Sequence, residues 1–186
     1  MGALAIIAAG FLLAPLVYVI ATYNRLVTLR THMRESWADI DVEMKRRYDL
    51  IPNLVETVRG YASHEQSVLE EVTKLRNQAA DSTGSPTQQG VDEAALQIGV
   101  GRLFAVAEAY PDLKADTQFL ALQRELANTE DRIAASRRFY NANVRDLNEL
   151  RQSFPSNFVA SMFGFEEADF FTLSSDAERA VPRVDL

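Results

Sequence analysis

From Phe119 to Phe154, apolar and small polar residues follow one another at alternating intervals of three and four. The positions are Phe119, Leu122, Leu126, Thr129, Ile133, Ser136, Tyr140, Asn143, Leu147, Leu150 and Phe154. This spacing places them on one face of an α-helix, and no segment competes with the two-residue alternation of a half-buried strand. The pattern predicts an all-α fold with a long amphipathic helix over residues 115–154.

Three further stretches of the chain have the same period. They cover residues 26–44, 51–79 and 96–110. The run DSTGSPTQQG at residues 81–90 predicts a loop by composition, and Pro111 ends the third stretch. Four amphipathic helices with short connections must bury their apolar faces against one another. We therefore expect an antiparallel four-helix bundle over residues 25–153.

The first 24 residues, MGALAIIAAGFLLAPLVYVIATYN, contain no charged side chain. As a helix rising about 1.5 Å per residue, this run is long enough to cross the hydrocarbon core of a bilayer. A cleaved export signal would have a basic start and an A-x-A-like cleavage site, and the run has neither. We therefore expect a retained transmembrane helix over residues 1–24.

The charges that flank this segment predict its orientation. Arg25, Arg30 and Arg34 follow it, whereas only the terminal amine precedes it. Positive flanks are retained in the cytoplasm, so we expect a single-pass protein of the inner cell membrane with its N-terminus outside and its helical body in the cytoplasm. Tyr18 and Tyr23 suit the membrane interface, where amphipathic rings gather.

The connection between the first two helices has two interpretations. We expect a turn at residues 49–52, because Asp49 can cap a helix and Pro52 fits only a first helical turn. The turn would place the basic residues 45–47 at the end of the bundle distal to the membrane. The alternative is one continuous helix. Its register would bring Arg47 into the seam, and Pro52 would remove an internal hydrogen bond at a cost of about 3 kcal/mol.

The segment FPSNFVASMFGFEEADFF, residues 154–171, holds six of the ten phenylalanines. We expect residues 154–186 to form a Phe-rich cap over the base of the bundle, followed by a flexible tail. The alternative is that Phe158, Phe163 and Phe165 enter the membrane interface, which would make the protein a lipid-binding module of the membrane surface.

The composition excludes several functions. The net charge of −7 argues against nucleic-acid binding. The chain contains no cysteine, so it has no disulfide framework, thiolate nucleophile or thiolate metal site. Its two histidines, His32 and His64, lack metalloprotease spacing, and nucleotide-binding and nucleophile-elbow motifs are missing. We therefore expect neither cofactor nor metal.

Acidic residues precede the basic run at residues 45–47. Asp41 and Lys45 are four residues apart, as are Glu43 and Arg47, which is typical of ion pairs on a solvated helix face. The alternative is a hydrolase that uses Asp39, Asp41 and His64. That hypothesis requires a concave pocket where the three side chains converge.

Several motifs point to a known family. YNRLV follows the uncharged run at residues 23–27, and KRRYDLIPNLVE occupies residues 45–56. The second half contains AVAEAYPDLKA at residues 105–115 and EDRIA at residues 130–134. With these motifs the chain resembles the LemA family over nearly its whole length. The resemblance implies an N-terminal anchor, an antiparallel four-helix body and no established catalytic residue.

These observations together predict a membrane-anchored interaction or scaffold protein of the bacterial cell envelope, without catalytic activity. Two groups of cations are candidate contact surfaces, because charges at the rim of an interface steer partners. They are the tip with Lys45, Arg46 and Arg47, and the face with Arg132, Arg137 and Arg138. The expected partners are the lipid bilayer and membrane or envelope proteins. The resemblance adds a membrane-bound heat-shock protease, a frequent genomic neighbour of family members.

Overall fold

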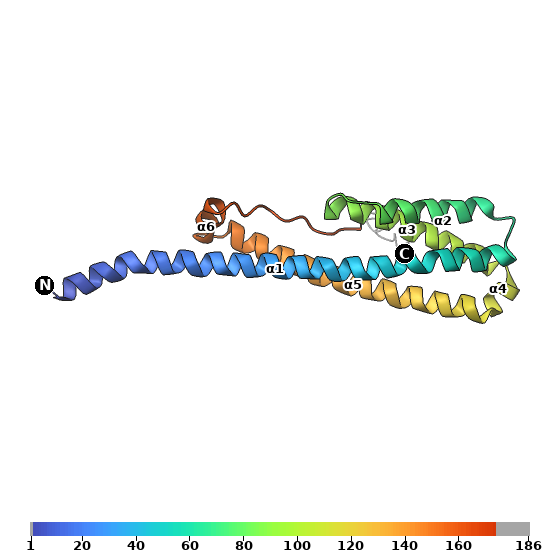
Figure 1. Cartoon of the computed structure of the whole chain (residues 1–186), viewed down its shortest axis with the longest axis horizontal. Helices are drawn as coiled ribbons and strands as arrows, with labels where there is room; N and C mark the ends of the chain where they lie inside the picture. Colours follow the sequence, from blue (N-terminus) through green and yellow to red (C-terminus); the bar gives the residue numbers. More distant parts are fainter. Residues whose placement is uncertain (1, 174–186) are drawn as a thin grey trace, which may run out of the picture. The chain divides into compact units, whose positions relative to one another are not determined.

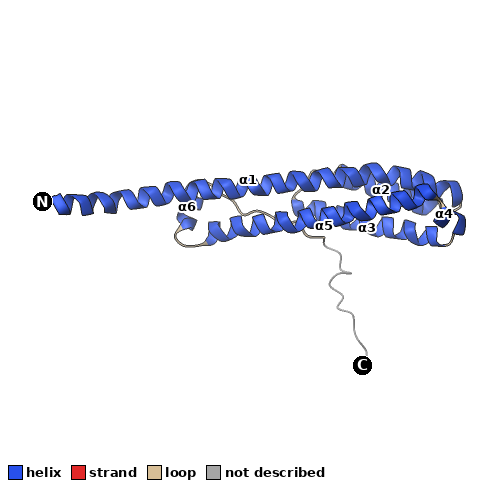
Figure 2. Ribbon diagram, turned by 90° about the horizontal axis from the view of Figure 1, so that it is seen from below, coloured by secondary structure: helices blue, strands red, loops and turns tan. Residues whose placement is uncertain are grey.

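The structure, a computed structural model, describes the backbone of residues 2–173 and their side chains except those of residues 3–12. Within this part every regular element is a helix, which confirms the predicted all-α fold (Figure 2). The helices are α1 (Gly2–Tyr61), α2 (Gln66–Ala80), α3 (Pro86–Glu108), α4 (Pro111–Ala115), α5 (Thr117–Gln152) and α6 (Ser156–Met162). The predicted flexible tail falls on residues 174–186, outside the described part.

Residues 2–24 of the predicted transmembrane segment form the first part of α1. The side chains of residues 1 and 3–12 lie outside the described part. Among the residues that are described, no helix has a stretch both long and apolar enough to cross a membrane. The anchor therefore remains a prediction. Beyond residue 12, α1 leaves large apolar side chains exposed, namely those of Leu13, Leu16, Val17 and Ile20.

The chain forms two compact units, and α1 and α5 each contribute to both. The first unit comprises residues 1–38 and 138–168. The second comprises residues 39–137 together with the segment that begins at residue 169.

The second unit is a helical bundle made of α2, α3, α4, the end of α1 and the beginning of α5. Turns at residues 62–65 and 81–85 reverse the chain, so that successive helices run antiparallel, and α2 and α3 lie side by side (Figure 1). Its core consists of the apolar positions that recur every three or four residues. They include Ile40, Met44, Ile51, Leu54, Val58, Leu69, Val72, Leu96, Leu103, Phe119, Leu126 and Ile133.

The predicted turn at residues 49–52 is wrong. α1 continues through Pro52 to Tyr61, and the chain turns at residues 62–65 instead. The missing N–H of Pro52 deprives the carbonyl of Tyr48, four residues earlier, of its helical donor. Arg76 of α2 replaces that donor, because its Nε donates to the Tyr48 carbonyl oxygen at 2.9 Å. The cost of the proline within α1 is therefore offset by a contact from another helix.

The segment after residue 168 lies against α3. Phe171 is fully buried, and a Cβ atom added to Gly90 would lie only 2.1 Å from the carbonyl oxygen of Thr172. Only a glycine leaves room for the chain at that point of α3.

The first unit has a core of its own, formed by Leu26, Leu147, Val159, Ala160 and Phe165. These side chains come from α1, α5, α6 and the residues after α6.

Polar contacts complete the first unit. Asn148 of α5 donates to the carbonyl of Ala168 and accepts from its N–H, both at 2.9 Å. Asn143 of α5 donates to the hydroxyl of Ser36 of α1 at 2.6 Å. The chain that follows α6 is therefore attached to α5 by paired hydrogen bonds.

Candidate functional site

A cluster of charged side chains lies inside the second unit, where α1, α3 and α5 bring Arg47, Glu93 and Glu130 together. Arg47 is buried, and its Nη2 contacts Oε2 of Glu93, which is only 1% exposed. Its Nη1 donates to Oε1 of Glu130 at 2.7 Å. Removing an ion from water costs several kcal/mol, so a buried guanidinium requires such carboxylate partners. The cluster thereby joins three helices.

Tyr48 and Gln89 extend this cluster. The Tyr48 hydroxyl contacts Oε1 of Glu93 and lies 3.2 Å from the carbonyl oxygen of Ala79. Nε2 of Gln89 donates to Oε1 of Glu93 at 2.9 Å and to the same carbonyl at 3.1 Å. Burial raises the pKa of Tyr48 to about 12. The phenol is therefore neutral at physiological pH and serves as a hydrogen-bond donor.

A cavity of about 350 Å³ opens beside Tyr48. Its wall carries two cations, and both are bound by groups of the protein. Lys45 Nζ donates to Oδ2 of Asp41 at 2.6 Å, as the spacing of these residues predicted. Arg76 donates to the Tyr48 carbonyl. The Lys45 pair lies within α1, whereas the Arg76 hydrogen bond holds α1 against α2.

The structure does not bring the residues of the hydrolase hypothesis together. Asp39 and Asp41 belong to α1, whereas His64 lies in the turn after the end of that helix. About six helical turns, with a rise of roughly 30 Å, separate them. Among the side chains that the structure describes, no group of three or more His, Cys, Asp or Glu residues is arranged to hold a metal ion.

Comparison with known proteins shows the family of this chain. The family model of the LemA family matches residues 36–186. The chain belongs to the LemA family. Two magnetosome proteins of Paramagnetospirillum magneticum, MamQ 1 and MamQ 2, are each 25% identical to it over 194 residues, which cover 91% of this chain and 71% of the relative. A protein LemA of Metamycoplasma hominis is 24% identical over 163 residues, covering 88% of this chain and 72% of the relative.

Two of the LemA-like motifs, at residues 45–56 and 130–134, supply part of the buried cluster, while Glu93 and Gln89 lie in neither. The first contains Arg47, Tyr48 and Pro52, and the second begins with Glu130. In this LemA-family chain, the motifs from distant parts of the sequence therefore meet in the interior of one helical unit.

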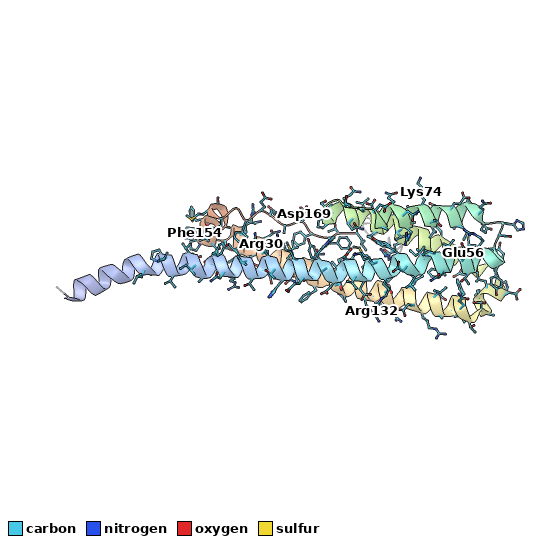
Figure 3. All side chains as sticks on the ribbon, viewed as in Figure 1. Arg30, Glu56, Lys74, Arg132, Phe154 and Asp169 are labelled. Atoms are coloured by element: carbon cyan, nitrogen blue, oxygen red, sulfur yellow. The ribbon has the colours of Figure 1, made fainter. Side chains whose placement is uncertain are left out.

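The predicted basic tip does not exist as such, because residues 45–47 lie within α1. Arg47 is buried and offers no exposed cation, since the helix continues and its register turns this side chain inward. Lys45 is exposed, and Arg46 lies 3.4 Å from Glu43, the partner that the spacing had assigned to Arg47. Arg132 projects from α5 and approaches the same Glu43 at 3.9 Å (Figure 3).

Arg46 and Arg132 therefore lie together around one carboxylate of the second unit. Lys45 belongs to the same segment of α1. Arg137 is partly exposed in this unit, while Arg138 is exposed and belongs to the first unit. We call Lys45, Arg46 and Arg132 the basic surface.

The five predicted membrane-interface residues all belong to the first unit. Tyr18, Phe158 and Phe163 are exposed, Tyr23 is partly buried and Phe165 is buried. The ring of Tyr23 lies 4.7 Å from that of Phe163 and 6.0 Å from that of Phe165, measured between centroids. Phe165 therefore belongs to the core of this unit, and Phe158 and Phe163 to its surface.

Glu93 and Gln89 were not recognised from the sequence, although the helical period contains a signal for them. Counting back from Leu96 in steps of three and four gives Glu93 and then Gln89, on the apolar face of α3. A carboxylate on the buried face of one helix requires a cation on the buried face of another. Arg47 meets that requirement only in the register of a continuous α1.

Proposed function

We propose that this LemA-family chain is a non-catalytic interaction module that its uncharged N-terminal segment anchors in a bacterial membrane. The observation that carries the proposal is the uncharged run of residues 1–24, which leaves several large apolar side chains exposed. Leu13, Leu16, Val17 and Ile20 are each more than half exposed on a helix without a charged neighbour in that run. Such a surface is unfavourable in water and favourable in lipid.

The orientation in this proposal follows from the residues after the uncharged run. Arg25, Arg30 and Arg34 favour a cytoplasmic body and an N-terminus outside the inner membrane.

The interaction role is supported by the way in which the polar groups of the interior are used. Four polar side chains of the interior bind one another and hold helices together, as structural residues do. They are Arg47, Tyr48, Gln89 and Glu93. The relatives named for the magnetosome carry the name of a cellular structure and not of a reaction. The partners in this proposal are membrane or envelope proteins, with a membrane-bound heat-shock protease among the candidates.

The basic surface is the contact region that we assign to such partners. Lys45, Arg46 and Arg132 present cations of the second unit to solvent, and two of them, Arg46 and Arg132, lie within 4 Å of Glu43. Charges of this kind steer a partner and contribute to specificity more than to affinity.

The anchor is tested by alkaline carbonate extraction of membranes from cells that produce the full chain. Leu16→Lys should move the protein to the soluble fraction, because a lysine near the middle of a membrane helix costs about 3 kcal/mol. Val42→Lys is the matched control, since Val42 is 56% exposed on the same helix and Leu16 is 54% exposed. If the two variants fractionate alike, the anchor is wrong.

The basic surface is tested by in-cell crosslinking of the full chain followed by mass spectrometry. The double charge reversal Arg46→Glu with Arg132→Glu should remove the crosslinked neighbours. Asp39→Asn, a change of one exposed carboxylate on α1, should leave them unchanged. A set of neighbours that survives the charge reversal, or the lack of any reproducible neighbour, would contradict the proposed contact region.

A further inference from the structure

The two longest uncharged segments of this chain meet in the first unit. One is the run of residues 1–24, and the other is QSFPSNFVASMFGF, residues 152–165. Ala14, Pro15 and Tyr18 from the first segment line an apolar groove of about 710 Å³ together with Pro155 and Phe158 from the second. Segments that are far apart in the sequence thus form one continuous uncharged surface.

α6 has one buried face and one exposed face. Ser156, Val159 and Ala160 are buried in the unit. Four large apolar side chains on α6 or directly beside it are exposed, namely Phe154, Phe158, Met162 and Phe163. Phe154, beside α6 in Figure 3, is 81% exposed. We call these four residues the aromatic face. The rings of Phe154 and Phe158 stack edge to face with their centroids 5.9 Å apart.

The size of the aromatic face favours lipid over protein as its partner. With about 200 Å² for each fully exposed side chain, the exposed fractions of its four members correspond to roughly 500 Å². A stable protein interface requires about 800 Å² from each partner. Interfacial membrane contact has no such minimum area, because its strength scales with the apolar area that is buried in the lipid.

The charges near this surface also suit a bilayer. Arg25 is exposed directly after the first uncharged segment, and the Arg30 guanidinium lies 4.8 Å from the centroid of the Phe165 ring. Cations beside aromatic rings are typical of the headgroup level, where the charged group remains in water and the ring contacts the lipid.

We propose that the aromatic face inserts into the interfacial region of the phospholipid bilayer beside the N-terminal helix, and so gives the first unit a second membrane contact. This inference rests on the proposed anchor. It goes further, because it assigns a lipid contact to residues that follow the bundle, more than a hundred residues after the anchor.

The absence of cysteine from the chain permits a direct test. A single Phe158→Cys substitution in the full chain is labelled with the environment-sensitive fluorophore NBD and reconstituted in vesicles of phosphatidylcholine and phosphatidylglycerol. Phe139→Cys is the matched control, because Phe139 is 63% exposed and Phe158 is 64% exposed in the same unit. Circular dichroism verifies that both labelled proteins keep their helical content.

The label at position 158 should show a blue-shifted emission with an intensity several-fold higher than the label at position 139. Lipids with a nitroxide near the headgroup should quench the label at position 158, while the label at position 139 should behave as in water.

Flotation of the same vesicles measures the anchor separately. Flotation with equal, water-like emission at both positions would overturn the aromatic contact alone. A blue shift without quenching by the nitroxide lipids would indicate a protein partner and would also overturn it. Failure to float would overturn both proposals.

Discussion

Arg47 is held by two carboxylates that differ in burial. The side chain of Glu93 is 2% exposed, whereas that of Glu130 is 36% exposed. A carboxylate in the interior cannot exchange its ion pair for water, but a carboxylate at the surface can do so in part. The two glutamates therefore contribute unequally to the stability of the second unit, although both contact the same guanidinium.

This difference gives the first prediction. Glu93→Gln should lower the free energy of unfolding by about 3 kcal/mol, because the buried guanidinium of Arg47 then keeps only one of its two carboxylate partners. Glu130→Gln, the matched control, should lower it by less than about 1 kcal/mol. Urea unfolding followed by circular dichroism measures both values. Equal losses would show that burial does not distinguish the two partners.

Tyr48 gives a second prediction, which concerns pH. Its pKa is about 12 in the folded protein and 10.0 for an unperturbed tyrosine. Because the folded state binds this proton more tightly, the stabilisation is fully present below about pH 10 and is lost as the pH rises towards 12. Between these values the free energy of unfolding should fall more steeply for the native protein than for Tyr48→Phe. Urea unfolding at several alkaline pH values tests this, and parallel curves would contradict it.

At the level of single helices, two glycines of α3 have opposite environments. A Cβ atom at Gly101 would meet no atom within 4 Å, whereas a Cβ atom at Gly90 would collide with the backbone of Thr172. Gly101→Ala should raise the free energy of unfolding by up to about 1 kcal/mol, because alanine favours the helix. Gly90→Ala should lower it by about 1–3 kcal/mol, because the backbone must move. Changes of the same sign in urea unfolding would show that the segment after residue 168 does not lie against α3.

The contact between Arg76 and the Tyr48 carbonyl predicts a coupling between Arg76 and Pro52. Arg76→Met should cost about 1–2 kcal/mol in the native background, because it leaves a backbone acceptor without its donor. In the Pro52→Ala background it should cost much less, since the restored N–H of residue 52 serves that carbonyl. A double-mutant cycle in urea measures the coupling. Strict additivity would mean that the arginine does not compensate for the proline.

This pair also shows where prediction from sequence succeeds and fails. The period of apolar residues predicted most of the buried positions, although Phe154 at the end of the longest series is 81% exposed. The alternative of a continuous α1, which the preferred turn set aside, placed Arg47 inward. The rule for proline predicted a break, because it counts only the hydrogen bonds within one helix. The compensating donor, Arg76, lies 28 residues after Tyr48, and rules for a single helix do not consider a donor so far along the chain.

The start of α3 was missed for another reason. Residues 81–90 were assigned to a loop by composition, yet α3 begins at Pro86. Ser85 caps it by accepting from the N–H of Gln88, and proline is favoured in the first turn. The Ser-Pro pair within this run is thus a signal for the start of a helix, although the composition of the run is typical of a loop. Gln89 of the buried cluster was missed along with it, because it lies in that first part of α3.

At the scale of the whole chain, each unit has a separate core, and this yields a fifth prediction. Phe165→Ala removes a buried ring from the first unit and should destabilise it by about 3 kcal/mol. Hydrogen exchange measured by mass spectrometry should accelerate in α6, while α2 and α3 keep their protection, because distant sites contribute independently. Equal acceleration in α2 and α3 would show that the two units open as one.

The division of the chain has a practical consequence for fragments and for biosynthesis. Residues 138–168 interrupt the stretch that builds the second unit, and residues 39–137 interrupt the stretch that builds the first. No single proteolytic cut or truncation can therefore release one unit intact. On the ribosome, α1 and α2 emerge long before Phe165 and Phe171 complete the two cores. Both cores thus depend on residues near the end of the described chain, so that a nascent polypeptide halted before them lacks part of each.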